Sequence, residues 1–542
     1  MVLAGGFVGA RFDPRPVVLH KVPSLEPPAR ISRTFPLVLA GVLALRVFYA
    51  VASPLDLAPD EAFYWDWGRR LDWCYVSKPP LIAWSMRLAG ALGGDSVVGI
   101  RLVAVVLGAL TLCFSYLLAR ELFGRAAAAW VVLIQIATPG TVGLNGLLTI
   151  DAPLAAAWSA ALWLFWRVSD GRAGAWTRAG LTAALAAGIL AKQMMLVFPL
   201  MAALFLALDR RGAAGRWRAW AWSSGIALAA TLTPILIWNA RHSWALFAHS
   251  SEHFTASELA GLLSSWRTFS ASLGEQVGLG GGLLWVLVCA CLVAASLAWR
   301  RLERRARFLL LFSAPGLIAI ALLSLRQSTH ANWPLVYYAS AWILTAGWIA
   351  GSLPELRLAA AWRRCAGPGV VLGLALVLLF YAYVWAAPAL GLAGGHLDPS
   401  ARLRGWREFG RAAGELIADS EEPPVLVLLG PGRAVASALA FYAPGRPRVH
   451  TWREDPAILT QYDLWGGPAD PIGRDFVFFL EQPELPRSWR RCFDSVEDLG
   501  LLRAQAGTVL ERAVRVVHGT NLRGLPDPLG TWRATSARPD SP

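Results

Sequence analysis

The chain has little charge for its length. Only 16% of its 542 residues are charged and 56% are hydrophobic, whereas soluble domains carry about 25% charged residues. These proportions exclude an ordinary soluble protein and indicate a polytopic membrane protein. The formal net charge of +14 does not indicate nucleic-acid binding, because the basic residues lie in short loops between apolar segments. Arginine in such loops sets membrane topology.

Metal-binding cysteine motifs and internal repeats are also lacking. The six cysteines have none of the spacings typical of zinc sites. Cys289 and Cys291 lie inside an apolar segment and are interpreted as packing residues. Cys74 and Cys492 can meet outside the membrane, but the sequence alone does not pair them. The absence of a repeat sets the chain apart from transporters built of duplicated halves.

Apolar segments fill most of the first 390 residues. By the hydropathy criterion, they predict eleven spanning helices at 35–53, 96–119, 126–143, 152–167, 179–191, 193–208, 219–238, 282–299, 308–325, 335–351 and 369–388. Residues 81–93 can add a short or interfacial helix. The expected fold class is an α-helical polytopic membrane protein with about 11–13 transmembrane helices and a C-terminal soluble α/β domain.

Arginine alternates between successive loops. The arginine-rich loops carry Arg120 and Arg125; Arg167, Arg172 and Arg178; Arg210, Arg211, Arg216 and Arg218; Arg300 through Arg307; and Arg357, Arg363 and Arg364. Because cytoplasmic loops carry the excess of arginine and lysine, the N-terminus is predicted to be cytoplasmic. The intervening loops and everything from residue 396 onward are then expected on the periplasmic side of a bacterial inner membrane.

The domain boundaries follow from the change in composition. We expect a cytoplasmic tail at 1–34, a transmembrane catalytic domain at 35–390, a periplasmic α/β domain at 396–530 and a disordered tail at 531–542. Within the α/β domain, Trp406–Ala418 is predicted to be an amphipathic helix, and Val425–Leu429 and Phe476–Leu480 to be buried strands.

The stretch from Pro59 to Leu81 is the centre of the predicted site. It contains the acidic pair Asp60 and Glu61, a cluster of aromatic residues and Lys78. Each of these charges is expensive inside a bilayer, about 2.5–3.5 kcal/mol or more. The stretch is therefore expected at a membrane–water boundary, where tryptophan and tyrosine rings are favoured.

Four polar features are predicted on the same outer side. They are the Asp60-Glu61 pair, Lys78, Asp151 and Lys192. Two carboxylates and two lysines at one face can activate a hydroxyl and neutralise a phosphate. Asp60 and Asp151 can also hold a divalent ion such as Zn, Mg or Mn through oxygen ligands. Further candidates for substrate binding are Tyr64, Arg326, His330 and Asn332.

Each of these residues also has a simpler interpretation. Asp60 and Glu61 can form an ordinary solvated loop. Asp151 precedes Ala-Pro at a helix start and can serve only as an N-cap. Lys78 and Lys192 can extend along apolar surface to reach water. Their joint placement favours the functional interpretation.

Several motifs resemble a known family. They are Asp60-Glu61-Ala62-Phe63-Tyr64-Trp65, Lys78-Pro79-Pro80, Thr149-Ile150-Asp151-Ala152-Pro153, Gly188-Ile189-Leu190-Ala191-Lys192, Ala331-Asn332-Trp333-Pro334 and Gln461-Tyr462-Asp463-Leu464-Trp465. In order and spacing they resemble the polyprenyl-phosphate-sugar glycosyltransferases of the GT-C superfamily. The resemblance is greatest to the bacterial branch with the aminoarabinose lipid A transferases and the family 39 proteins related to protein O-mannosyltransferases.

This resemblance implies an inverting sugar transfer from a lipid monophosphate donor at the periplasmic face. It implies that Asp60 is the base or its organiser, that Asp151 is its partner, and that Lys78 and Lys192 hold the donor phosphate. The acceptor is expected to be lipid A, another glycan or a protein. Ser77 stands where relatives commonly carry an acidic residue. This difference weakens the inference of an aminoarabinose donor and the inference that a metal is used.

Two other functions remain open at this stage. A transporter or flippase of a lipid-linked sugar is one alternative, although its broken midplane helices are not evident here. An inactive relative that serves as a scaffold is the other. The Gly430-Pro431-Gly432 sequence lacks the third glycine of a dinucleotide-binding fingerprint, so it predicts a plain strand–helix turn.

Overall fold

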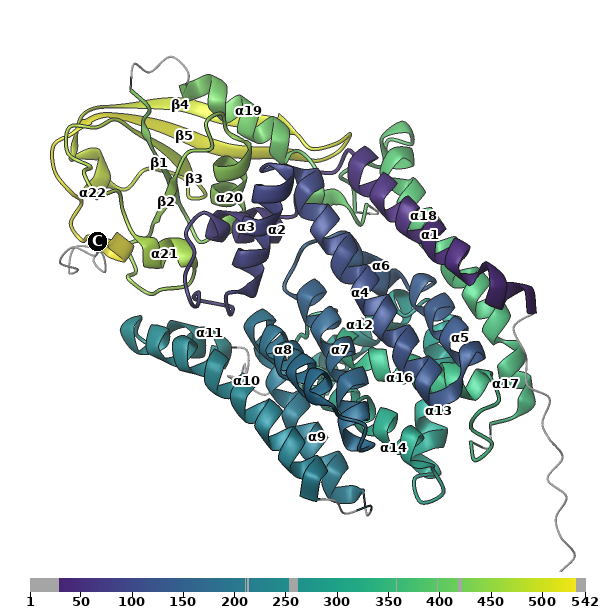
Figure 1. Cartoon of the computed structure of the whole chain (residues 1–542). Helices are drawn as coiled ribbons and strands as arrows, with labels where there is room; N and C mark the ends of the chain where they lie inside the picture. The colour runs from purple at the N-terminus through teal and green to yellow at the C-terminus, as the bar shows by residue number, and fades with distance from the viewer. Residues whose placement is uncertain are drawn as a thin grey trace, which may run out of the picture.

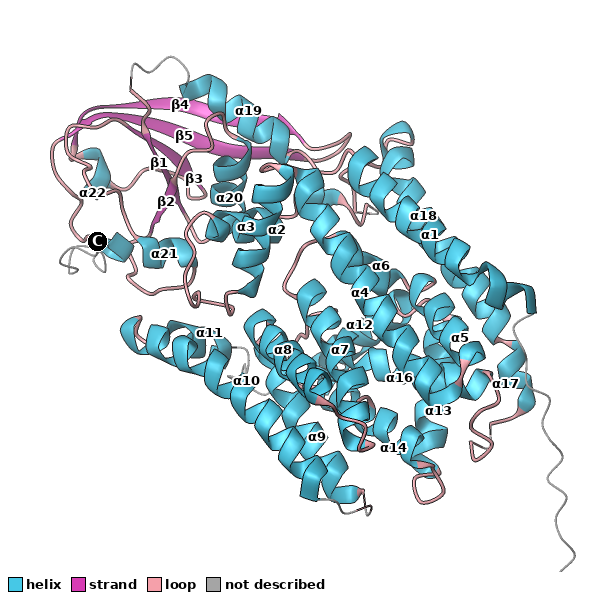
Figure 2. Cartoon of the chain, viewed as in Figure 1, coloured by secondary structure: helices cyan, strands magenta, loops and turns pink. Residues whose placement is uncertain are grey.

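The computed structural model describes residues 29–209, 211, 214–252, 262–356, 358–396, 398–417 and 422–532. The predicted N-terminal tail at 1–34 and C-terminal tail at 531–542 therefore fall largely outside the described residues. Helices make up most of the described chain, and one small sheet lies at one end of them (Figure 2). This is the expected class, a helical membrane protein with a C-terminal α/β domain.

The helices form a bundle, and most of its members are labelled in Figure 1. Before the sheet they are α1 Ala29–Ala52, α2 Pro59–Gly68, α3 Leu81–Gly93, α4 Val97–Phe123, α5 Arg125–Ile136, α6 Pro139–Gly146, α7 Asp151–Ser169, α8 Ala175–Ala191, α9 Val197–Leu208, α10 Ala214–Arg241, α11 Ala245–Glu252, α12 Leu262–Leu279, α13 Leu283–Leu297, α14 Arg304–Leu311, α15 Ala314–Ser324, α16 Leu335–Ile349, α17 Ala360–Arg364 and α18 Ala366–Ala389.

All eleven predicted apolar segments are helical, but several are shorter or more broken than expected. The segment 126–143 is divided into α5 and α6, which meet at 73°, because Pro139 starts a new helix and cannot continue the old one. In the described part of the chain, four helices are long and apolar enough to cross a membrane, or six if each bent pair counts as one span. The number of eleven spans stays a prediction.

The arginine-rich loops meet at the end of the bundle opposite the sheet (Figure 1). Arg172 lies 2.6 Å from Glu121, and Arg304 lies 2.8 Å from Asp209. Arg305 donates to the carbonyl of Leu122 at 2.7 Å. These contacts join loops far apart in the sequence, so the charge alternation along the chain corresponds to two ends of one bundle.

The C-terminal domain is built on a five-stranded mixed sheet of order β2-β1-β3-β5-β4. Its strands are β1 Val425–Leu429, β2 Val449–Trp452, β3 Phe476–Leu480, β4 Phe493–Gln505 and β5 Glu511–Leu522. The first three are parallel, and β5 and β4 are antiparallel additions. Around them lie α19 Trp406–Ile417, α20 Arg433–Tyr442, α21 Gln461–Trp465 and α22 Arg487–Arg490. The predicted strands at β1 and β3 and the helix at α19 are confirmed.

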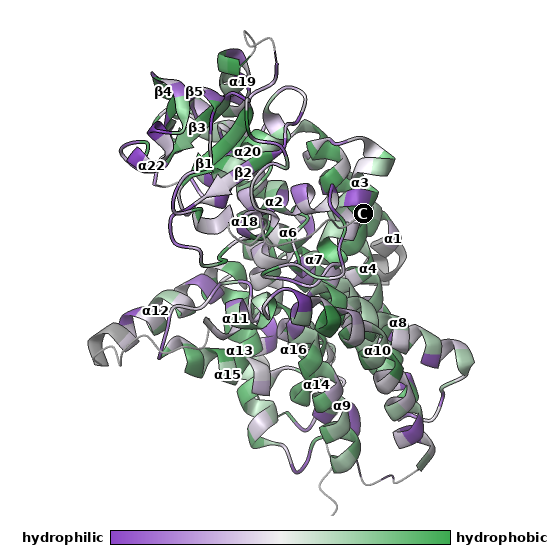
Figure 3. Ribbon diagram, turned by 90° about the vertical axis from the view of Figure 1, so that its left-hand side faces the viewer, coloured by the Kyte–Doolittle hydropathy of each residue, from purple (hydrophilic) through white to green (hydrophobic). Residues whose placement is uncertain are grey.

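The two faces of this sheet have different partners. Side chains alternate along a strand, so Leu426 and Leu428 point to one face and Val427 to the other. The first face shares a hydrophobic core with the aromatic residues of α2, including Phe63 and Trp65. The aromatic cluster predicted for the membrane boundary is thus buried against the C-terminal domain. In Figure 3, α2 lies next to α20, between the sheet and the rest of the bundle.

Hydrogen bonds reinforce this junction. The Asp56 carboxylate accepts from the backbone N–H groups of Trp406 and Arg407, so it caps α19 from another part of the chain. Gln461 of α21 accepts from the N–H of Val76, in the loop between α2 and α3. That loop also carries Lys78, and its position is therefore fixed by the C-terminal domain.

Neither Cys74 nor Cys492 forms a disulfide. Cys74 is buried beside Asn239 of α10, and the Cys492 thiol donates to the carbonyl of Ser488. The pairing that the sequence left open is absent.

Candidate active site

Asp60 begins the site at the first turn of α2. Its carboxylate lies 2.5 Å from the guanidinium of Arg433, the first residue of α20. The same guanidinium lies over the ring of Phe63, 4.9 Å from its centroid. Both side chains of the ion pair are more than a third exposed. The pair is accessible, and the C-terminal domain supplies one half of it.

Asp151 lies at the first turn of α7, where the helix dipole stabilises a negative charge. One carboxylate oxygen lies 2.8 Å from the Lys192 ammonium. The other accepts a hydrogen bond of 2.5 Å from the side-chain amide of Asn332. The carboxylate makes no capping hydrogen bond to its own helix, so the interpretation of Asp151 as a simple N-cap is wrong.

Lys192 occupies a break between two short helices. α8 ends at Ala191, and Lys192 is extended, with φ −160° and ψ 139°, before a 3₁₀ turn at Gln193–Leu196. Gly188 permits this break, because a Cβ there would lie 2.5 Å from a side-chain atom of Met195. The Lys192 side chain is buried and faces Asp151, so it does not extend along the lipid surface.

Lys78 lies close to both carboxylates. Burial, followed by the charge of Lys192, lowers the pKa of the Lys78 ammonium to about 8, against the opposing charge of Asp151. Arg433 and Asp60 act on the same ammonium with smaller effects. The two prolines after it precede α3, which begins at Leu81. These residues form what we call the charged cluster: Asp60, Lys78, Asp151, Lys192 and Arg433.

Glu61 occupies a different position from its neighbour. It has no exposed surface, and its carboxylate accepts from the backbone N–H groups of Ala58 at 2.9 Å and Leu148 at 3.0 Å. Burial raises the pKa of this carboxyl, although Arg101, 3.9 Å away, opposes the shift. Through these contacts Glu61 joins α2 to the segment before α7, and its predicted catalytic role stays a prediction.

The remaining predicted residues lie at different distances from the charged cluster. Tyr64 is buried in α2, and burial together with Asp60 raises the pKa of its hydroxyl. Asn332 contacts Asp151, as described above. His330 lies beside Trp333 with ring centroids 5.5 Å apart, and Arg326 is exposed just after α15.

The residues of the charged cluster do not fit a divalent metal in this arrangement. Among the described residues, no group of three His, Cys, Asp or Glu side chains could hold an ion. Each expected ligand, Asp60 and Asp151, already has a cationic side chain as its partner. A metal would have to displace an arginine or a lysine from these carboxylates.

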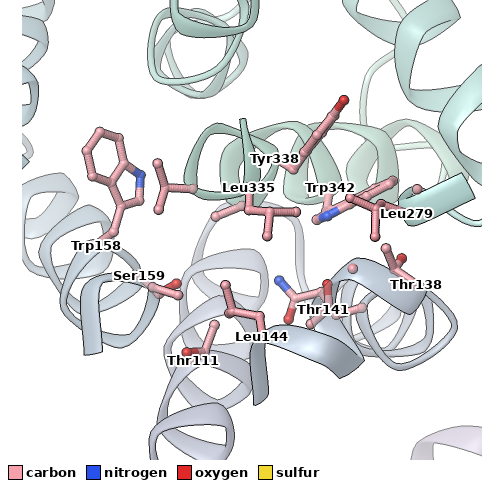
Figure 4. A pocket seen from close by; sticks show the side chains of 16 residues that line it. Thr111, Thr138, Thr141, Leu144, Trp158, Ser159, Leu279, Leu335, Tyr338 and Trp342 are labelled. Atoms are coloured by element: carbon pink, nitrogen blue, oxygen red, sulfur yellow. The ribbon is translucent and has the colours of Figure 1, made fainter. Parts of the chain in front are cut away.

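A small cavity lies within the bundle, between α6, α7 and α16 (Figure 4). It is lined by Trp158 and Ser159 of α7, Thr138 before α6, and Leu335 and Trp342 of α16. Its volume is about 40 Å³, which is room for a few water molecules and too little for a sugar.

Arg433 is the residue that the sequence did not reveal. It lies in a soluble domain, 373 positions from Asp60, and arginine is too common in this chain to mark it. The rarity of lysine in the sequence is a further indication of the site. The chain contains three lysines, Lys21, Lys78 and Lys192, and two of the three are in the charged cluster.

The fold is that of a membrane protein of known structure. The chain superposes on the structure of ArnT from Cupriavidus metallidurans in the apo state with a TM-score of 0.59 and 17% identity, covering 94% of this chain and 100% of that one. The ArnT structure bound to undecaprenyl phosphate gives a TM-score of 0.58 and 18% identity, with 89% and 98% coverage. The expected fold is confirmed.

Sequence comparisons agree with the resemblance seen in the motifs. Residues 77–238 match the family described as dolichyl-phosphate-mannose-protein mannosyltransferase. The chain is 27% identical over 316 residues to lipid A galacturonosyltransferase RgtD of Rhizobium johnstonii, covering 57% of this chain and 64% of the relative. It is also 27% identical over 234 residues to the undecaprenyl phosphate-alpha-4-amino-4-deoxy-L-arabinose arabinosyl transferase of Pseudomonas aeruginosa, covering 39% and 40%. These alignments span less than two thirds of either relative.

Proposed function

We propose that this protein is a membrane glycosyltransferase that moves a sugar, with inversion, from a polyprenyl-phosphate donor to an acceptor hydroxyl. The observation that carries the proposal is the charged cluster, in which two carboxylates and three cations meet at the junction of the bundle and the C-terminal domain. A lipid monophosphate sugar needs cations for its phosphate and a base for the acceptor. The cluster supplies both.

In this mechanism the acceptor oxygen attacks the anomeric carbon on the side opposite the phosphate. The bond from that carbon to the phosphate oxygen breaks, and its electron pair leaves with the polyprenyl phosphate. Asp60 accepts the proton of the acceptor hydroxyl as the new glycosidic bond forms, a step that contributes roughly 10²–10⁴-fold to the rate. Lys78 stabilises the charge that develops on the leaving phosphate.

Asp151 acts through its neighbours. It holds the Lys192 ammonium at 2.8 Å and the Asn332 amide at 2.5 Å, so it orients a cation toward the donor phosphate. Both of its oxygens are engaged, which leaves Asp60 as the carboxylate available to the acceptor. Asp151 is thus a positioning residue, and its loss is expected to raise the KM for the donor more than it lowers kcat.

Arg433 links donor binding to the freeing of the base. In the structure its guanidinium is paired with Asp60. A phosphate placed beside Lys78 competes with Asp60 for this guanidinium, because arginine pairs well with phosphate oxygens. Once the donor takes Arg433, the Asp60 carboxylate is free to accept a proton. The base is then released only when a donor is bound.

The acceptor class and the sidedness belong to the same proposal. The name of one relative, lipid A galacturonosyltransferase, supports a lipid A acceptor, with another glycan or a protein as alternatives to be tested. The gathering of arginine-rich loops at the opposite end of the bundle supports a periplasmic charged cluster and C-terminal domain in a bacterial inner membrane. Reporter fusions at residues 125, 215, 305 and 396 test this orientation.

The deciding experiment is sugar transfer by purified protein with a panel of radiolabelled polyprenyl-phosphate sugars and lipid A. Asp60→Asn is nearly isosteric and is expected to lower the rate roughly 10²–10⁴-fold, with an unchanged melting temperature. Glu415→Gln, an exposed carboxylate change on α19, is the control. If Asp60→Asn keeps most of its activity, the charged cluster is not the catalytic centre, and a transporter of lipid-linked sugars has to be tested instead.

A further inference from the structure

A second polar site lies at the other end of the bundle, away from the charged cluster. It is a cavity of about 290 Å³ between the end of α9, the connection after it, and the turn from α13 into α14. Its lining residues are Phe205, Leu208, Asp209, Arg211, Trp299, Arg304, Arg307 and Leu311. Nothing in the proposed transfer reaction uses these residues, so the cavity calls for a separate explanation.

The cavity is positively charged on one side. Three of its lining residues are arginines and one is an aspartate. Arg216 and Asp170, which pair with this group, add one charge of each sign. Four arginines and two carboxylates leave a formal excess of two positive charges. Burial raises the pKa of Asp209, but hydrogen bonds and charge from Arg304 and Arg216 outweigh burial and hold that pKa below its ordinary value.

Arg304 is the cation of the cavity that several contacts hold in place. Its guanidinium donates to Asp209 at 2.8 Å and to the carbonyl of Ser169 at 2.7 Å. It also lies over the rings of Trp166 and Phe205, at 4.5 and 5.1 Å from their centroids. These contacts hold the cation rigidly at the base of the cavity, where it contributes a positive field without being free to move.

Arg307 is the cation of the cavity that is available to a ligand. Its Nε donates to the carbonyl of Trp299 at 3.2 Å and one terminal nitrogen donates to the carbonyl of Arg300 at 3.0 Å. These bonds orient the guanidinium without neutralising it, and no carboxylate among the described residues pairs with Arg307. A partly exposed cation aimed by two backbone carbonyls is suited to an anionic ligand.

The other wall of the cavity is apolar. Phe205, Leu208, Trp299 and Leu311 line it, and Leu208 is 47% exposed at its edge. Phe205 and Leu208 lie in α9 and Leu311 in α14, which belong to apolar segments of the membrane domain, while Trp299 lies in the turn after α13. A free inorganic anion gains nothing from such a wall, whereas a phosphate attached to acyl chains uses both sides. Basic pockets between membrane helices bind anionic lipid head groups by this combination.

We propose that this cavity binds the phosphate head group of an anionic glycerophospholipid, with Arg307 as its direct contact and Arg304 as the fixed charge behind it. The volume is close to the ~300 Å³ at which small-ligand pockets begin, which suits a glycerophosphate better than a complete sugar-bearing lipid. The proposal does not rest on the transfer reaction, because the two sites lie at opposite ends of the bundle (Figure 1).

The test uses the full-length protein in phosphatidylcholine nanodiscs and native mass spectrometry to count retained phosphatidic acid molecules. We expect one retained molecule in the wild type and about fivefold or greater loss of affinity in Arg307→Gln, since a basic residue near a charged head group contributes about that factor. Arg300→Gln is the matched control. It removes a charge from the same turn, but Arg300 is outside the cavity lining, so binding should stay within about twofold of the wild type.

A second variant tests the same cavity in case the Arg307→Gln variant does not fold. Leu208→Glu places a negative charge at the exposed edge of the cavity and is expected to expel the lipid while leaving the melting temperature unchanged. Inorganic phosphate, as the alternative ligand, should neither bind nor compete at millimolar concentration. Equal loss of lipid in Arg307→Gln and Arg300→Gln overturns the proposal, as does competition by inorganic phosphate alone. Retention of the lipid by the Leu208→Glu variant overturns it as well.

Discussion

The guanidinium of Arg433 lies 2.5 Å from the carboxylate of Asp60, so the C-terminal domain completes a site that begins in the membrane domain. The contact depends on how the two parts pack. Helices α2 and α20 lie side by side, and the Ser437 hydroxyl of α20 donates to the carbonyl of Pro59. A soluble domain with no part in the site would not need to place a charged side chain beside Asp60.

Replacement of Arg433 should therefore weaken donor binding. Arg433→Gln is expected to raise the KM for the polyprenyl-phosphate sugar about 10-fold or more, since a charge-assisted hydrogen bond contributes about 1.5–3 kcal/mol. Steady-state transfer kinetics provide the measurement. Arg446→Gln is the matched control, because Arg446 is similarly exposed and also bridges the two parts, through Asp95. Equal effects of the two variants would show that Arg433 only holds the domains together.

Glu61 and Asp60 should behave differently although they are adjacent. Glu61→Gln is expected to lower the free energy of unfolding by about 1–3 kcal/mol, because one buried backbone N–H group loses a good acceptor and Arg101 loses its nearby charge. The protein that remains folded should transfer sugar at close to the wild-type rate. Thermal unfolding and transfer assays at a temperature below both transitions separate the two effects. A folded Glu61→Gln protein without activity would return Glu61 to the catalytic residues.

Donor binding should weaken as the pH rises through about 8. The pKa of Lys78 is lowered to about 8, so the ammonium that binds the phosphate loses its proton above that pH. The value of kcat/KM for the donor, which reports the free enzyme, is expected to fall above pH 8. Lys78→Arg keeps its charge throughout this range and should abolish the fall. A fall of the same size in Lys78→Arg would assign the ionisation to another group.

The deprotonation of Lys78 does not lower kcat/KM by unfolding the protein. Its pKa in the folded protein is below the usual 10.5, so the folded state disfavours the charged form. This destabilisation is complete below pH 8 and disappears as the pH rises toward 10.5. With respect to this group, the protein becomes more stable in the range where donor binding weakens, and the melting temperature measured across pH 7–10 provides the check.

Metal removal should leave the reaction intact. Asp60 and Asp151 are paired with Arg433 and Lys192, and these cations fill the role that a divalent ion would have beside the donor phosphate. Transfer after treatment with EDTA is expected to stay within about twofold of the untreated rate, against the 10²-fold or greater loss that follows removal of an essential group. Recovery of a lost rate by Mg²⁺, Mn²⁺ or Zn²⁺ would contradict this expectation.

The sequence by itself determined the class of the molecule. Hydropathy placed every apolar segment on a helix, and the arginine alternation identified loops that meet at one end, because both follow from the cost of burying charge in a bilayer. The strands at Val425–Leu429 and Phe476–Leu480 were also predicted, since a run of buried apolar residues is a local property. The motifs around Asp60, Lys78, Asp151 and Lys192 identified the polar residues of the site.

Only the tertiary structure decided what each of these residues contacts. Asp60 and Glu61 are neighbours in sequence, but the helix turns one toward Arg433 and the other into the core beside Arg101. The partner of Asp60 comes from a domain whose strand β2 carries a weaker local signal and pairs with β1, more than 20 residues earlier in the chain. Side-chain direction and long-range packing depend on the whole fold, so no local pattern of residues contains them.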